Sequence, residues 1–318
     1  MDAAAFLHYL ITLPNYKEQI IHTQHIPAQD ATFGKLNKPL KPALQARLES
    51  LGISRLYRHQ AKALNAIFAG RNVIVATPSA SGKTLCYHLA TLEAILSDAK
   101  SCALYTFPTK ALAQDQLRSL KQIACSLSLR AESEAIPQEA VAIFDGDTPQ
   151  NERAKVRKQA RIVLTNPDML HIGILPNHQL WSRLFRHLKY VVIDEAHVYR
   201  GVFGSHVANV LRRLRRLCAF YGSSPQFICC SATIANPKEH AQNLVGLPFE
   251  AIVEDGSPHG EKYFAFWNPP LPNEAKTGRR SANSEASFLF SELVQKDIRS
   301  LVFARTRKLT ELICIYAQ

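Results

Sequence analysis

The sequence has no apolar run that approaches the roughly 20 residues needed to span a bilayer. Its first residues carry neither a basic leader nor a small-residue cleavage site, so they are not typical of a signal peptide. The seven cysteines are scattered and form no CxxC pair, which argues against a zinc site of the common spacing. Together these absences predict a cytoplasmic protein with no membrane partner and with reduced cysteines.

Acidic residues are scarce beside basic ones, with 26 Asp and Glu against 38 Lys and Arg and a net charge of +12. Such an excess suits a polyanionic partner such as nucleic acid. Apolar residues make up 47% of the chain, so disorder is excluded as its main state. A length of 318 residues leaves room for two domains.

Short β-branched or aromatic runs alternate with longer stretches of helical period, which predicts a parallel sheet flanked by helices. The expected strands are residues 72–76, 102–107, 141–144, 162–165, 190–193 and 226–230. The expected helices between them include residues 85–96, 111–124 and 206–221. The fold class is therefore α/β, with strands buried on both faces.

A phosphate-binding loop of the GK[ST] type follows the first expected strand and opens the next helix. In such a loop the backbone N–H groups face the phosphates, the lysine reaches the β- and γ-phosphates, and the hydroxyl holds Mg²⁺. Only one of the usual glycines is present, and a chance surface turn is the alternative interpretation. The residues expected to bind ATP here are Thr77, Pro78, Ser79, Ala80, Ser81, Gly82, Lys83 and Thr84.

Two carboxylates, Asp194 and Glu195, come at the end of another apolar strand, 111 residues after Lys83 by subtraction of the two numbers. Asp194 is expected to reach Mg²⁺ together with Thr84. Glu195 is expected to orient or deprotonate the attacking water, because phosphoryl transfer needs positioning and charge neutralisation. We therefore take Glu195, Lys83 and Asp194 as the candidate catalytic residues. A simple helix cap is the alternative interpretation of the acidic pair.

The tetrad Asp194-Glu-Ala-His197 resembles that of superfamily-2 DEAH-box helicases, and other segments match this family in the expected order. Gln60 ends a stretch that resembles the Q motif, whose glutamine reads the adenine edge. Ser231-Ala-Thr233 is similar to motif III, which in that family links the ATP site to strand binding. The resemblance implies that His197, Ser231, Ala232 and Thr233 have this coupling role.

The same resemblance implies contacts with a single strand through loops that grip phosphates without reading sequence. Residues 107–114 resemble motif Ia, residues 165–168 resemble motif Ib, and residues 301–308 resemble motif IV. Residues 145–149, 171–176 and 199–206 narrow the similarity to the YprA/MrfA branch, which implies DNA repair and 3′ to 5′ translocation. The implied nucleic-acid contacts are Pro108, Thr109, Lys110, Gln114, Gly146, Thr165, Asn166, Pro167 and Arg305.

Four parts are expected along the chain. Residues 1–50 form an accessory helical segment, 51–267 the RecA-like ATP-binding domain, 268–287 a linker rich in Pro, Asn, Ser and Gly, and 288–318 the truncated start of a second RecA-like domain. The last part is expected to contain one strand, at residues 301–304. We expect a fragment, and weak ATP hydrolysis by it, because the arginines of the second domain are missing.

The leading hypothesis is thus an ATP-dependent translocase that uses ATP and Mg²⁺ on single-stranded or partly duplex nucleic acid, with DNA favoured over RNA. A nucleic-acid-binding module with impaired catalysis is an alternative, motivated by Pro78 and the sparse glycines. An RNA helicase is another. The basic runs at residues 153–161 and 211–217 are interpreted as solvated helix faces, with phosphate contact as the alternative.

Overall fold

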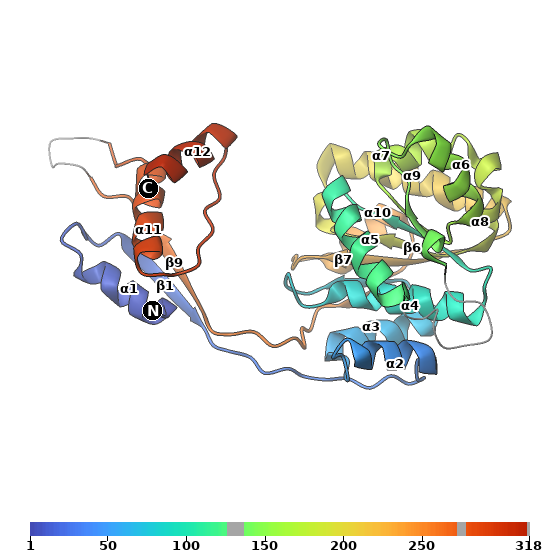
Figure 1. Ribbon diagram of the computed structural model, residues 1–318, viewed down its shortest axis with the longest axis horizontal. Coiled ribbons are helices and arrows are strands. Elements are labelled where there is room, and N and C mark those ends of the chain that lie inside the picture. The colour runs from blue at the N-terminus through green and yellow to red at the C-terminus, as the bar shows by residue number, and fades with distance from the viewer. Residues whose placement is uncertain (126–136, 272–277, 317–318) are drawn as a thin grey trace. The chain divides into compact units, whose positions relative to one another are not determined.

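The computed structural model describes residues 1–125, 137–271 and 278–316, which fall into two compact units (Figure 1). Residues 31–258 form one unit, and residues 1–30 together with 259–318 form the other. Among the described residues, no helix is both long and apolar enough to cross a membrane.

The larger unit is built on a seven-stranded sheet with the order β4-β5-β3-β6-β7-β2-β8, in which every neighbouring pair is parallel. Its strands are β2 (Val73–Ala76), β3 (Cys102–Thr106), β4 (Val141–Ile143), β5 (Ile162–Thr165), β6 (Leu188–Ile193), β7 (Gln226–Ser231) and β8 (Glu250–Ile252). The sheet confirms the predicted α/β class and all six strands expected from the sequence.

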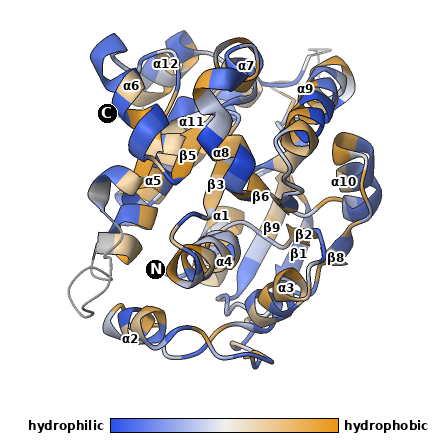
Figure 2. Cartoon of the chain, turned by 90° about the vertical axis from the view of Figure 1, so that its right-hand side faces the viewer, coloured by the Kyte–Doolittle hydropathy of each residue, from blue (hydrophilic) through white to orange (hydrophobic). Residues whose placement is uncertain are grey.

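Helices cover both faces of this sheet. Successive strand residues point to opposite sides, so the apolar strands place side chains on both faces that must be buried. Val73 and Val75 join one apolar cluster, and Ile74 between them joins the other. The first cluster includes α2 (Pro42–Ser50), α3 (Arg58–Phe68), α4 (Lys83–Ser97) and α5 (Lys110–Cys125). The second includes α6 (Gln150–Gln159), α7 (Pro167–Met169), α8 (Ser182–His187), α9 (Gly201–Phe220) and α10 (Pro237–Val245). Figure 2 shows β3, β5 and β6 in hydrophobic orange between these helices.

The smaller unit contains a two-stranded antiparallel ladder of β1 (Ile20–Ile26) and β9 (Lys262–Trp267). Its described residues form three helices: α1 (Ala3–Thr12), α11 (Ala282–Gln295) and α12 (Arg307–Tyr316). The Tyr9 hydroxyl donates to Glu292 at 2.7 Å, and the Trp267 indole donates to Glu285 at 2.9 Å. Side-chain hydrogen bonds thus join both α1 and β9 to α11.

The structure differs from the expected division of the chain in three places. Residues 1–50 are not one helical segment, because they contain strand β1 and are split between the two units after Asp30. Strand β9, expected in the first domain, pairs instead with β1. Helix α11 begins at Ala282, inside the expected linker. The pairing partner of β1 lies more than 200 residues away, and local sequence patterns carry no signal of such a distant pairing.

The strand expected at residues 301–304 is not formed. Leu301 is 86% exposed and Phe303 is 92% exposed. A strand needs a neighbour to satisfy its backbone groups, and the described strands of both sheets are other segments. The sequence has the apolar composition of a buried strand there, but the structure provides no sheet to receive it.

Candidate active site

The phosphate-binding loop connects the carboxyl end of β2 to the start of α4. The Lys83 Nζ donates to the backbone carbonyls of Thr77 at 2.9 Å and of Pro78 at 2.7 Å. Across the loop, the hydroxyls of Thr77 and Ser81 lie 2.7 Å apart. The loop therefore closes around its own lysine, and Pro78, Ser79 and Ala80 at its tip are exposed.

Gly82 lies at the end of this loop with φ of +80°, a conformation that residues with a Cβ rarely adopt. A Cβ added there would lie 2.7 Å from the side-chain nitrogen of Gln60. Gln60 Nε2 donates to the Gly82 carbonyl at 3.0 Å, while its Oε1 accepts from the Tyr57 amide at 2.9 Å. Gln60 thus anchors the loop to the start of α3, and its role towards adenine stays a prediction.

Asp194 follows β6 and is 5% exposed. Its carboxylate accepts hydrogen bonds from the Tyr87 hydroxyl at 3.0 Å and from the Glu195 amide at 3.0 Å. Burial and then the neighbouring Glu195 charge raise the pKa of Asp194 to about 6, while the positive charge of Lys83 lowers it. Because Tyr87 lies one turn after Lys83 on α4, its hydrogen bond joins Asp194 to the helix that the phosphate-binding loop begins.

Strand β7 lies between β6 and β2, and Cys230 on it connects the two motifs. This buried thiol is 3.9 Å from the Lys83 carbonyl oxygen, and the Asp194 charge raises its pKa after the larger effect of burial. The carboxyl ends of parallel strands meet at one edge of a sheet, where α/β proteins bind their ligands. The phosphate-binding loop and the acidic pair share that edge.

The donor set fits a magnesium–nucleotide. Mg²⁺ in such sites is held by one or two carboxylates, with phosphates and water supplying the other ligands. In the described part of the chain, no group of three or more His, Cys, Asp or Glu gathers as a metal cage. Asp194 and the half-buried Thr84 are the residues that would hold the ion, and Lys83 would face the phosphates.

Glu195 has φ of +49°, one of the few left-handed residues other than glycine in the part of the chain that the structure describes. Such strain is found where function requires a fixed side chain, and it costs on the order of 1–3 kcal/mol. His197 lies next to it, with Nδ1 3.2 Å from Glu195 Oε2 and 3.3 Å from the Ala232 amide. The structure therefore places the DEAH histidine between the expected catalytic carboxylate and motif III.

The other motif III side chains face different surroundings. Ser231 is fully buried at the end of β7, and its hydroxyl donates to the Ala232 carbonyl at 2.8 Å. Thr233 is exposed. The backbone of Ala232, rather than a side chain of motif III, makes the described contact with His197.

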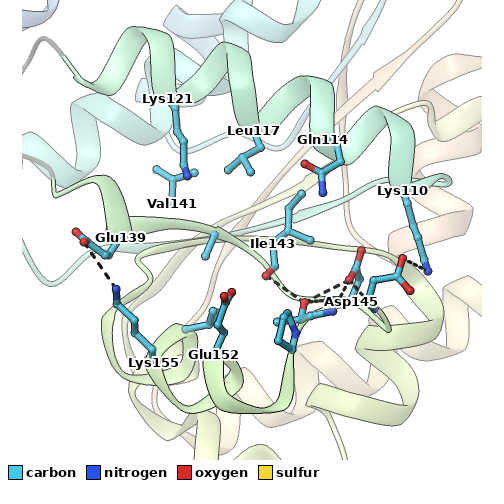
Figure 3. A pocket seen from close by; sticks show the side chains of 15 residues that line it. Lys110, Gln114, Leu117, Lys121, Glu139, Val141, Ile143, Asp145, Glu152 and Lys155 are labelled. Carbon is cyan, nitrogen blue, oxygen red and sulfur yellow. Dashed lines mark hydrogen bonds and ion pairs between the residues drawn. The ribbon is translucent and has the colours of Figure 1, made fainter.

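The start of α5 borders a cleft of about 610 Å³ that is lined by residues of both α5 and α6 (Figure 3). Lys110 and Gln114, two of the expected nucleic-acid contacts, lie on its wall. Thr109 accepts from the Leu112 amide at 3.3 Å, which helps to begin the helix, and Pro108 is half-buried. Lys110 donates to Asp147 at 2.6 Å, and this hydrogen bond raises the pKa of the lysine.

A tight turn after β4 holds Asp147 in place. Asp145 is buried and accepts through Oδ1 from the amides of Asp147 and Thr148, at 2.9 and 3.1 Å. Gly146 between them is exposed. Asp145 and Asp147 are not among the predicted site residues, although an aspartate that bonds the backbone two residues later is a common turn signal.

The motif Ib side chains are engaged in holding their own loop. The Thr165 hydroxyl is buried and donates to the Phe144 carbonyl at 2.7 Å. Asn166 Oδ1 accepts from the Met169 amide at 2.7 Å, and Pro167 occupies the first position of α7. Any contact of this loop with a strand is therefore expected through backbone groups. Arg305 is exposed and belongs to the smaller unit.

A DEAD/DEAH box helicase family profile matches residues 57–240. The uncharacterized ATP-dependent helicase YprA of Bacillus subtilis is 46% identical over 301 residues, which cover 95% of this chain and 39% of that protein. The ATP-dependent helicase HRQ1 of Saccharomyces cerevisiae is 42% identical over 301 residues, which cover 94% of this chain and 27% of that protein. The chain therefore spans less than half the length of these relatives.

Among solved structures, the DUF1998 helicase MrfA bound to DNA superposes with a TM-score of 0.89 and 43% identity. This match covers 100% of the present chain and 43% of the MrfA chain. The seven-stranded sheet is thus the RecA-like core found in helicases. By sequence and structure alike, the chain belongs to the DEAD/DEAH box helicase family and, within superfamily 2, to its YprA/MrfA-like branch.

Proposed function

We propose that this chain supplies the first RecA-like motor domain of an ATP-dependent DNA helicase or translocase. The observation that carries the proposal is the 3.0 Å hydrogen bond to Asp194 from Tyr87, which lies one turn after Lys83 on α4. Intact Lys83, Thr84, Asp194 and Glu195 favour catalysis over a purely structural nucleic-acid module. One related protein, MrfA, has been solved with both DNA and AMPPNP.

In the proposed reaction, Lys83 leaves the carbonyls of Thr77 and Pro78 and turns to the terminal phosphates. Bound Mg²⁺ would neutralise phosphate charge. Asp194 holds its ionised form through the hydrogen bonds from Tyr87 and the Glu195 amide. Glu195 orients water for attack on the γ-phosphate and receives its proton, while the bond between the γ-phosphorus and the bridging oxygen breaks and ADP leaves.

For the strand, we propose that Lys110, Gln114 and the loops at Gly146 and Asn166 contact the phosphate backbone. DNA as the substrate is supported by the likeness to MrfA, which was solved bound to DNA. The 3′ to 5′ direction and a role in DNA repair rest on the resemblance to the YprA/MrfA branch alone. Competition between DNA and RNA oligonucleotides of one sequence tests the first of these three points.

Calorimetric titration with Mg-AMPPNP tests the nucleotide site directly. Lys83→Ala removes a charged hydrogen bond to phosphate, so we expect affinity to fall about 10- to 100-fold. Glu195→Gln should bind within about two-fold of the unchanged protein yet lose about 10²- to 10⁴-fold in hydrolysis rate, as expected when a general base is removed. Equal affinities for the Lys83→Ala and unchanged proteins would refute the proposal.

A further inference from the structure

A fully buried tyrosine on the phosphate-loop helix connects the acidic pair to α5. Tyr87 lies one turn after Lys83 on α4 and has 0% exposure. Its hydroxyl is 3.0 Å from Asp194 Oδ2 and 3.2 Å from Gln116 Oε1. Gln116 belongs to α5, the helix that begins at Lys110. One hydroxyl therefore contacts both the expected metal ligand and the helix expected to bind the strand.

The two oxygens compete for a single proton. A tyrosine hydroxyl carries one hydrogen, while a carboxylate oxygen and an amide carbonyl oxygen are both acceptors. Burial raises the pKa of Tyr87 well above its ordinary value, so the phenol keeps that hydrogen. A stronger hydrogen bond from Tyr87 to Asp194 thus weakens its hydrogen bond to Gln116, and a stronger bond to Gln116 weakens the one to Asp194.

His88 next to Tyr87 holds Gln116 from the other side. Its Nε2 is 3.2 Å from Gln116 Oε1. Burial lowers the pKa of His88 to about 3, so the ring is neutral and can donate one N–H to that oxygen. Gln116 Oε1 is therefore fixed between two groups of α4, and a shift of α5 changes its distance to Tyr87.

We propose that Tyr87 is a positioning residue that couples nucleotide binding at Asp194 to strand binding on α5. The inference rests on the proposed function. When Asp194 holds a cation, its oxygens accept less strongly, and the phenol turns to Gln116. A strand that draws α5 towards α4 favours the same arrangement and releases Asp194. Each ligand therefore tightens the other, by the same factor in both directions.

The test measures binding alone. The Kd for Mg-AMPPNP is determined by calorimetry with and without a saturating single-stranded DNA oligonucleotide, and the ratio of the two values is the coupling factor. For the unchanged protein we expect a factor of about 5 or more. In Tyr87→Phe and in Gln116→Leu it should fall to within about two-fold of 1, with strand affinity in the absence of nucleotide retained.

Tyr105→Phe is the matched control. Tyr105 is also fully buried, its ring centroid is 5.2 Å from that of Tyr87, and its hydroxyl donates to the Tyr87 backbone carbonyl at 3.4 Å. This variant loses the same atom from the same cluster and should keep the full coupling factor. Denaturant unfolding of both variants verifies that each is folded.

The possible outcomes separate the two proposals. The coupling role is wrong, and the proposed function stands, if the unchanged protein binds both ligands but its coupling factor is 1. The same holds if Tyr87→Phe keeps the full coupling factor. Equal losses in Tyr105→Phe and Tyr87→Phe show a packing effect and also overturn the role. If the unchanged protein binds neither ligand, both proposals fail.

Discussion

Lys110 and Asp147 form a 2.6 Å ion pair on the wall of the cleft between α5 and α6, so a lysine expected to hold a phosphate is paired with a carboxylate of the same chain. A strand must compete with Asp147 for this lysine. Asp147→Asn should therefore raise affinity for single-stranded DNA by about two- to five-fold, a size typical of exposed ion pairs. Fluorescence anisotropy at fixed salt measures the change.

Glu139→Gln is the control for this prediction, because Glu139 pairs with Lys155 at 3.8 Å in the same cleft. It removes the same charge without freeing Lys110. An equal gain in affinity from both variants indicates a general charge effect, and no gain from Asp147→Asn contradicts the proposed competition.

Asp194 predicts a specific pH dependence of stability in the absence of metal and nucleotide. Its pKa is raised from 3.8 to about 6, chiefly by burial, so the folded protein binds a proton that the unfolded chain releases. The contribution of this group to the free energy of unfolding is full below about pH 4 and is lost as pH rises through about 6.

Asp194→Asn does not titrate and serves as the reference. The free energy of unfolding of the variant, relative to the unchanged protein, should rise between about pH 4 and pH 7 by at most about 3 kcal/mol. Urea unfolding with a chelator present measures it. A difference that stays constant over this range contradicts the raised pKa.

The phosphate-binding loop offers two opposite backbone substitutions. Ala80 has φ of +63°, so Ala80→Gly should relieve left-handed strain and stabilise the protein by about 0.5–1 kcal/mol after the entropy of glycine is subtracted. Gly82→Ala should destabilise it by at least about 1–2 kcal/mol, because the new Cβ would also displace Gln60. The denaturant midpoint of unfolding measures both changes. If the two variants shift this midpoint in the same direction, the account of backbone strain is wrong.

The two contacts of His197 Nδ1 exclude each other, since this atom accepts from the Ala232 amide only without a proton and pairs with Glu195 only with one. His197→Ala should reduce the stimulation of ATP hydrolysis by DNA about 2- to 30-fold, while Mg-AMPPNP affinity is retained. His240→Ala is the control, because His240 contacts the Ala196 carbonyl at 2.8 Å but not motif III. Equal losses in both variants count against a specific role for His197.

The sequence predicted the central sheet well because each of its inner strands is an apolar run ending in a polar loop. Lys83 and Asp194 could be assigned to one edge because parallel strands share their carboxyl ends. Tyr87 could not be found this way, since a tyrosine within an apolar helix is typical of an ordinary core. Its two acceptors lie on different elements, and only the packed structure brings them together.

The smaller unit was the least predictable part. Strand β1 is mostly exposed and rich in histidine, so its composition gives little indication that it pairs with β9. The segment at residues 301–304 has the opposite property, a strong strand composition without a neighbouring strand in the described sheets. In both cases the deciding factor is the presence of a partner, which local composition does not encode.

The Thr32 amide donates to the Gly256 carbonyl at 2.9 Å. The Thr32 carbonyl in turn accepts from the Arg58 amide at 2.8 Å. The two ends of the larger unit are therefore held side by side. Units with adjacent ends tolerate excision and circular permutation, because a short joint can close them without strain. Residues 31–258 can thus be engineered as a separate cassette, and the ends could be moved to an exposed turn elsewhere on its surface.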